Sequence, residues 1–173
     1  MAHVILGLLM LWPQSLYELT KHFEAGVSLF YSASTGSIKR ALDRLLAAGR
    51  ISVESATGPR GKKTYAITEE GRAEFRRWML DPGRGGDGET AVLARTFFLG
   101  LLEGEDRSVA AHRVHDRIRQ DLNRLEQLDA QLPSIEVPEG FEEVAHYQLA
   151  TLQYGIATGR TALRWAEEYL NEG

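Results

Sequence analysis

The segment Ser34–Glu54, STGSIKRALDRLLAAGRISVE, decides the fold expected of this chain. Its apolar residues recur at intervals of three and four, which predicts an amphipathic helix that opens near Ser34 or Thr35 and ends at Gly49. The expected core face consists of Ile38, Ala41, Leu42, Leu45 and Leu46.

The opposite face of this helix carries cations at Lys39, Arg40 and Arg44. Arg40 and Arg44 are like charges four residues apart, which costs a helix a few tenths of a kcal/mol, and only Asp43 offers local relief. A helix that gives up local stability in this way indicates that its charged face has a function.

The composition of the 173 residues is that of a globular protein, with 43% apolar and 25% charged residues. Cysteine is absent, so disulfides, thiolate zinc sites and thiol nucleophiles are excluded, and a cytoplasmic location is expected. The most apolar run, Val4–Trp12, is stopped by Pro13 at about half the roughly 20 residues that a membrane span needs. We interpret it as a core helix and expect no membrane association.

Charge is distributed unevenly along the chain. Residues 1–80 hold 11 Lys and Arg against 7 Asp and Glu (net +4), whereas residues 81–173 hold 9 against 17 (net −8). This asymmetry indicates that the first half faces a polyanion and the second does not.

The first 80 residues follow the order helix, helix, helix, strand, strand, helix. The first helix is expected at residues 4–11, and the capping-box spacing of Ser15 and Glu18 opens a second that runs to about residue 24. Alternating apolar residues predict strands at 50–54 and 64–68 around a basic turn at 57–63, after which Thr68 caps another helix. This order matches a winged helix, so the expected fold class is mainly α (α+β), with a two-stranded wing and a C-terminal helical dimerisation region.

A glycine-rich segment, DPGRGGDG at residues 81–88, separates the two halves. We therefore predict a winged-helix domain at 1–80, a linker at 81–89 and a helical domain at 90–173, with helices at 90–102, 107–132 and 141–170. The last helix has two apolar or aromatic stripes, which implies two burial surfaces. One stripe includes Leu152, Ile156 and Leu163, and the other includes Tyr147, Tyr154 and Trp165.

In a winged helix the third helix enters the DNA major groove and the hairpin tip reaches the adjacent backbone or minor groove. Arg40 is the expected guanine reader, because its guanidinium pairs bidentately with O6 and N7. Hydroxyl groups at the helix start and cations elsewhere are expected to bind phosphate. The predicted DNA-binding residues are Tyr17, Lys21, Ser34, Thr35, Ser37, Lys39, Arg40, Arg44, Arg60, Lys62 and Lys63.

Four segments, SLYELTKHFE (15–24), STGSIKRALDRLLAAGRI (34–51), GKKTYAITEEGRAEF (61–75) and LARTFFLGLL (93–102), resemble the PadR family of bacterial transcriptional regulators. The resemblance is to the branch with a long, virulence-activator-like helical C-terminal region. It implies a homodimer that binds a pseudo-palindromic double-stranded DNA operator, usually as a repressor. The family commonly has an aromatic residue and then proline where this chain has Lys39 and Arg40, so a different operator preference is expected.

Other readings of the chain remain open. His112, His115 and Asp116 share one helix face and form a candidate metal site, although no further ligand completes it and we expect no metal, cofactor or enzymatic activity. A protein-interaction module that uses the helical half is a second alternative. A third alternative is that a small aromatic effector binds in a cavity within the dimer core. The predicted interface or effector residues are Phe97, Phe98, Tyr147, Leu152, Tyr154, Ile156, Leu163 and Trp165.

Overall fold

The computed structural model of the chain describes residues 1–57, 62–81, 88–134 and 136–170, with no description of the side chains of residues 55–57, 62 and 134. The chain divides into two compact units, Met1–Ala110 and Ala111–Gly173, and each is described here by itself.

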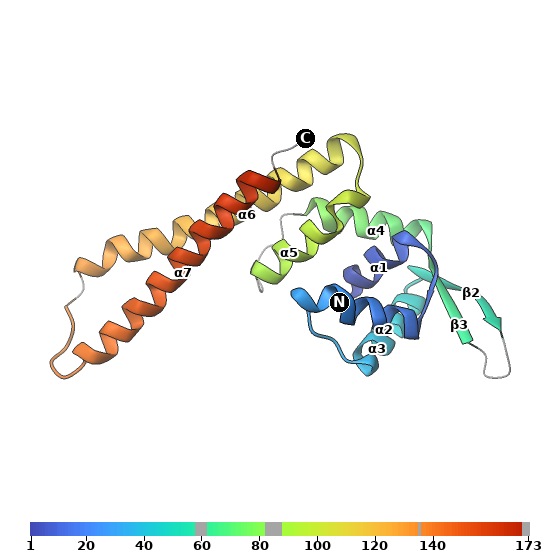
Figure 1. Ribbon diagram of the computed structural model, residues 1–173, viewed down its shortest axis with the longest axis horizontal. Helices are drawn as coiled ribbons and strands as arrows, with labels where there is room; N and C mark the ends of the chain where they lie inside the picture. The colour runs from blue at the N-terminus through green and yellow to red at the C-terminus, as the bar shows by residue number, and fades with distance from the viewer. Residues whose placement is uncertain (58–61, 82–87, 135, 171–173) are drawn as a thin grey trace. The chain divides into compact units, whose positions relative to one another are not determined.

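Unit 1 begins with three helices and continues with a hairpin and two further helices (Figure 1). Short 3₁₀ turns follow the second and the fifth helix. The elements are α1 (Ala2–Leu11), β1 (Gln14–Ser15), α2 (Leu16–Ala25), η1 (Val27–Leu29), α3 (Thr35–Ala47), β2 (Ile51–Thr57), β3 (Lys62–Ile67), α4 (Glu69–Leu80), α5 (Gly88–Phe98), η2 (Leu99–Leu101) and the start of α6 (Gly104–Gln131).

The local signals that predicted helix ends are confirmed. Ser15 Oγ accepts a hydrogen bond from the Glu18 backbone N–H, and the Glu18 carboxylate accepts one from the Ser15 N–H at 2.7 Å, which completes a capping box. The Thr68 hydroxyl accepts from the Gly71 N–H at 3.1 Å at the start of α4. Gly49, directly after the C-cap of α3, adopts a φ of 68°, which glycine reaches without strain.

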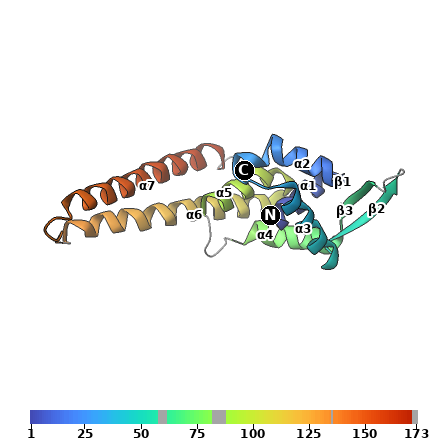
Figure 2. The same ribbon diagram turned by 90° about the horizontal axis from the view of Figure 1, so that it is seen from below.

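The sheet has three strands in the order β1-β3-β2, all antiparallel, rather than the two that were predicted (Figure 2). β1 pairs Gln14 with Tyr65, and β2 begins by pairing Ile51 with Ile67. The register shifts between Val53 and Ser55, which marks a β-bulge. The two hairpin strands are also longer than expected, because the ladder continues past the alternating apolar residues.

The core of unit 1 gathers residues from every helix around α1. Val4, Ile5, Leu6, Leu8 and Leu9 of α1 are at most 3% exposed, so this helix is enclosed on all sides. α5 contributes Phe98, whose ring lies so close to Gly7 that a Cβ there would be 2.8 Å from it. α5 therefore packs within unit 1. The linker predicted at residues 81–89 stays a prediction, since residues 82–87 lie outside the described part of the chain.

Unit 2 is a hairpin of two long antiparallel helices that lie side by side in both views (Figures 1 and 2). After α6 come a 3₁₀ turn, η3 (Leu132–Ser134), and α7 (Glu142–Tyr169). Gly155 and Gly159 allow the close approach of α6, since Cβ atoms there would lie 3.3 and 3.1 Å from Leu125 and Leu122. Two polar contacts link the same helices: Gln153 Nε2 donates to Asp129 at 2.7 Å, and Arg160 donates to Glu126 at 2.8 Å.

An aromatic and charged cluster joins α1, α4 and α5 within unit 1. The His3 ring stacks on Trp78 at 5.0 Å between centroids, and the Arg95 guanidinium lies 4.8 Å from the Trp78 ring. His3 also bonds to Glu74 at 3.1 Å. Burial is the largest influence on the pKa of His3 and lowers it; the bond and charge of Glu74 raise it, the positive N-terminus and Arg95 lower it, and the net shift is downward.

This cluster predicts that the stability of the protein falls as the pH drops below about 6.5. His3 has a depressed pKa only when folded, so the unfolded chain binds more protons in this range and protonation favours unfolding. Urea unfolding between pH 7.5 and 5.5 should show this slope, and His3→Phe, which keeps the stacking without titrating, should reduce it. The matched control His146→Phe changes an exposed histidine and should leave the slope as it is; an unchanged slope in His3→Phe would contradict the assignment.

Candidate nucleic-acid interface

The start of α3 presents an exposed group of hydroxyls and backbone N–H groups. Ser34 caps the helix, since its Oγ accepts from the Ser37 N–H at 3.2 Å, and the Ser37 hydroxyl donates back to the Ser34 carbonyl at 2.7 Å. Ser34 and Thr35 are exposed and Ser37 is half-buried. The first turn of a helix is the positive end of its dipole, so this end is suited to a phosphate group.

The cations on α3 all lie on its exposed face, opposite the buried Ile38 and Leu42. Lys39 lies 3.4 Å from Asp43, so its charge is partly compensated. Within the described residues, Arg40 and Arg44 have no carboxylate partner. The Arg40 guanidinium extends toward the start of α3, because a Cβ at Gly36 would lie 3.8 Å from its Nη1 atom.

The wing extends the positive surface of α3. Tyr65 of β3 is buried, and burial raises the pKa of its phenol, with a further increase from the charge of Asp43 on α3. Side chains alternate along a strand, so Lys63 lies on the same sheet face as Tyr65, and it is exposed. The predicted contacts at Arg60 and Lys62 fall on a residue and a side chain that lie outside the described part of the chain.

The two predicted contacts on α2 differ in their surroundings. Tyr17 is 68% exposed and its hydroxyl is available to a phosphate. Lys21 lies 5.9 Å from the Tyr17 ring but bonds to Glu24 at 2.7 Å, and that bond raises the pKa of Lys21. Glu24 compensates the positive charge of Lys21, so Lys21 attracts a DNA phosphate less strongly than an unpaired lysine at this position would.

Gln14 is a supporting residue that sequence reasoning missed. It is fully buried, its Nε2 donates to the Leu8 carbonyl at 2.7 Å, and its Oε1 lies 2.6 Å from His22 Nδ1. The side chain thus ties the end of α1 to α2, while its backbone pairs with Tyr65. Gln14 fixes α2 and its exposed Tyr17 against the wing strands; no sequence pattern marks a single buried amide of this kind.

The residues predicted for an interface or effector cavity are divided between the two units. Phe97 and Phe98 lie in unit 1, where Phe98 is 2% exposed and packs edge-on against Phe75. On α7, Ile156 is buried, Leu152, Leu163 and Trp165 are half-buried, and Tyr147 and Tyr154 are 64% and 74% exposed. The stripe with Ile156 therefore faces α6, and the tyrosines face outward.

The metal alternative finds no support in the described residues, among which no group of three or more His, Cys, Asp or Glu side chains could hold an ion. His115 is buried, whereas His112 and Asp116 are exposed. Among the same residues, none of the helices is both long and apolar enough to cross a membrane.

The helix order, the capped third helix and the wing define a winged-helix, DNA-binding type of regulator, joined to a helical C-terminal region. Residues 5–77 match the model of the PadR-like family of transcriptional regulators, and residues 91–172 match the model of the virulence activator alpha C-terminal region. These matches place residues 5–77 with the PadR-like transcriptional regulators and residues 91–172 with the C-terminal region of the virulence activators.

The chain is similar to several known proteins over nearly its full length. The "Probable transcriptional regulator Rv1176c" of Mycobacterium tuberculosis is 28% identical, with 96% of this chain and 93% of that protein covered. The Bacillus subtilis PadR structure in complex with operator DNA is 22% identical, with 98% and 95% covered and a TM-score of 0.45. The Vibrio cholerae virulence activator AphA is 20% identical, with 99% and 96% covered and a TM-score of 0.44. The assignment of each part of the chain rests on its own family model.

Proposed function

We propose that this protein is a sequence-specific DNA-binding regulator that acts as a homodimer on a pseudo-palindromic operator, as a repressor controlled by a small effector. The observation that carries the proposal is the exposed face of α3, where Arg40 and Arg44 lack carboxylate partners among the described residues. Unpaired arginines on a helix that fits the major groove are suited to guanine edges and phosphates.

The neighbouring groups have separate roles in this arrangement. α3 lies in the major groove with Arg40 toward the bases, while Ser34 and Thr35 at its start hold a phosphate. Lys63 on the wing and Tyr17 on α2 contact the backbone on either side, which fixes the register without reading sequence. In a symmetric dimer, the two half-sites are about 10 base pairs apart or a multiple of that.

The proposal is tested by binding of the full chain to the intergenic DNA upstream of its own gene, against random DNA of equal length, across a salt series. We expect a specificity ratio of about 10³ or more and an affinity that falls steeply with salt. Genome-wide selection of bound fragments extends the search to other operators. Weak binding without discrimination in both experiments would overturn the proposal.

The homodimer is supported by the outward stripe of α7. Tyr147, Tyr154 and Tyr169 are each at least 64% exposed, and Thr151 and Thr158 continue the stripe at three- and four-residue spacing from Tyr147 and Tyr154. Such a seam is typical of a helix that packs on a second helix. α6 already covers the other stripe, so a second copy is the partner we propose for this one.

Substituting Tyr154→Glu together with Tyr147→Glu should convert the dimer to a monomer, because four carboxylates would then meet at the seam of a twofold interface. Sedimentation velocity at micromolar concentration measures the change, and helix content by circular dichroism should remain. The control Gln120→Glu with Gln127→Glu makes the same charge change on exposed positions of α6 and should stay dimeric. Variants that sediment alike would contradict this choice of seam.

A further inference from the structure

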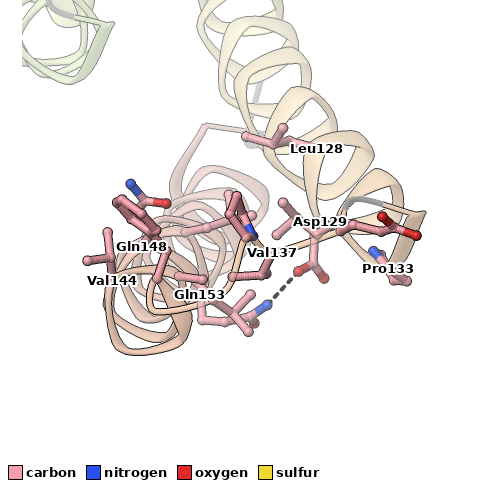
Figure 3. A pocket seen from close by; sticks show the side chains of 14 residues that line it. Leu128, Asp129, Pro133, Val137, Val144, Gln148 and Gln153 are labelled. Carbon is pink, nitrogen blue, oxygen red and sulfur yellow. Dashed lines mark hydrogen bonds between the residues drawn. The ribbon is translucent and has the colours of Figure 1, made fainter.

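The free end of the helical hairpin in unit 2 forms a half-open cavity of about 870 Å³. Figure 3 shows its walls, with Leu128 and Asp129 from α6, Val137 from the connecting segment, and Val144 and Gln148 from α7. Its apolar lining includes Leu128, Leu132, Val137, Phe141, Val144 and Leu152. The volume falls within the range of roughly 300–1,000 Å³ that is usual for small-molecule sites.

The polar groups of this cavity are acidic or neutral. Asp129 and Glu136 contribute carboxylates, Gln148 and Gln153 contribute amides, and none of the described lining residues is a lysine, arginine or histidine. Gln153 donates one hydrogen bond to Oδ1 of Asp129, which fixes this carboxylate at the wall of the cavity (Figure 3). An apolar cavity with carboxylates at its wall complements a ligand that has an apolar body and a positive charge.

The sequence around the cavity strengthens the same preference. Residues 125–159 contain six carboxylates, at positions 126, 129, 136, 139, 142 and 143, and no lysine or arginine; of the six, Glu126 is paired with Arg160. Such a one-sided distribution attracts cations and repels anions over several ångströms. Phe141, 57% exposed at the cavity, adds an aromatic face that favours a cation.

We propose that this cavity binds a small apolar cation, such as a lipophilic amine or an onium compound, as the effector of the regulator. Its role as effector rests on the proposed function, whereas the binding itself does not. A second copy that covered the cavity with the same surface would bring six further carboxylates to it, so the charge disfavours that occupant. Val144, Gln148 and Gln153 line the cavity and are neighbours of Tyr147 and Tyr154 on α7. A bound ligand would therefore lie next to the residues that we propose for the dimer interface.

Isothermal titration calorimetry of the full chain without DNA tests the site with a matched pair of probes, tetraphenylphosphonium and tetraphenylborate. The two ions have nearly the same size and shape and opposite charge. We expect one cation to bind per subunit, at least tenfold more tightly than the anion. The affinity for the cation should fall with added salt. Equal affinity of the two ions, or binding of neither, would overturn the proposal.

Charge variants locate the binding. Asp129→Asn with Glu136→Gln should weaken phosphonium binding about tenfold, whereas the control Glu139→Gln with Glu143→Gln removes the same charge outside the lining and should weaken it less than threefold. Equal losses in both pairs would place the cation elsewhere on the acidic end. If the first pair instead changes the dimer dissociation constant and the parent protein binds no phosphonium, a second copy fills the cavity and the proposal fails. Operator binding is measured on the parent protein without phosphonium, and its absence beside intact phosphonium binding would overturn the proposed function while supporting this site.

Discussion

Arg40→Ala is expected to weaken binding to operator DNA by about 1–3 kcal/mol, the discrimination that one bidentate arginine–guanine contact supplies. The side chain is exposed on α3, has no carboxylate partner among the described residues and extends toward the helix start, so it is free to meet a base edge. Binding to random DNA should change far less, because only one of several phosphate-facing charges is lost.

Fluorescence anisotropy with operator and random duplexes at fixed salt separates the two effects. Arg113→Ala removes an equally exposed arginine from α6 and serves as the control, which should bind both duplexes as the parent does. Equal losses on operator and random DNA for Arg40→Ala would show that Arg40 contacts phosphate and reads no base.

Gly71→Ala should cause a large loss of stability, about 3 kcal/mol or more. A Cβ at this position would lie 2.1 Å from the backbone carbonyl oxygen of Arg50, which already accepts a hydrogen bond from the Thr68 N–H at 3.1 Å. The clash is with main chain at the point where the hairpin and α4 meet, so no rotamer change relieves it.

Thermal unfolding measures this loss, which for a chain of this length corresponds to roughly 6–12 °C in Tm. Gly100→Ala provides the matched control, since a Cβ there would have no neighbour within 4 Å and the backbone φ is ordinary. It should change Tm little or raise it slightly. Similar midpoints for both variants would contradict the tight approach of α4 to the hairpin.

Much of the winged helix could be predicted because its signals are local. The cap at Ser15, the cap at Thr68 and the glycine after α3 each act within a few residues, and the structure confirms them. β1 could not be predicted, since two residues show no alternation and their partner strand lies about fifty positions further on. The buried amide of Gln14 escaped notice for the same reason.

The charges of the candidate site could be predicted, but their compensation could not. The spacing of Lys21 and Glu24 permits an ion pair without requiring one, and only the side-chain geometry shows it. In the sequence, either stripe of α7 could form the core. The structure shows that the stripe with Ile156 does, because Gly155 and Gly159 approach α6 closely on that side. The burial of Phe98 against α1 could not be predicted because it depends on long-range packing.

The bulge in β2 constrains how the length of the wing can change. Val53 pairs with Tyr65 and Ser55 with Thr64, so Glu54 is the extra residue, and alternation along β2 changes parity there. Deleting Glu54 would remove the extra residue, and the β2–β3 ladder would then continue without the register shift. A change of one residue at this position would therefore leave the pairing of Ile51, Ser52 and Val53 with β3 as it is.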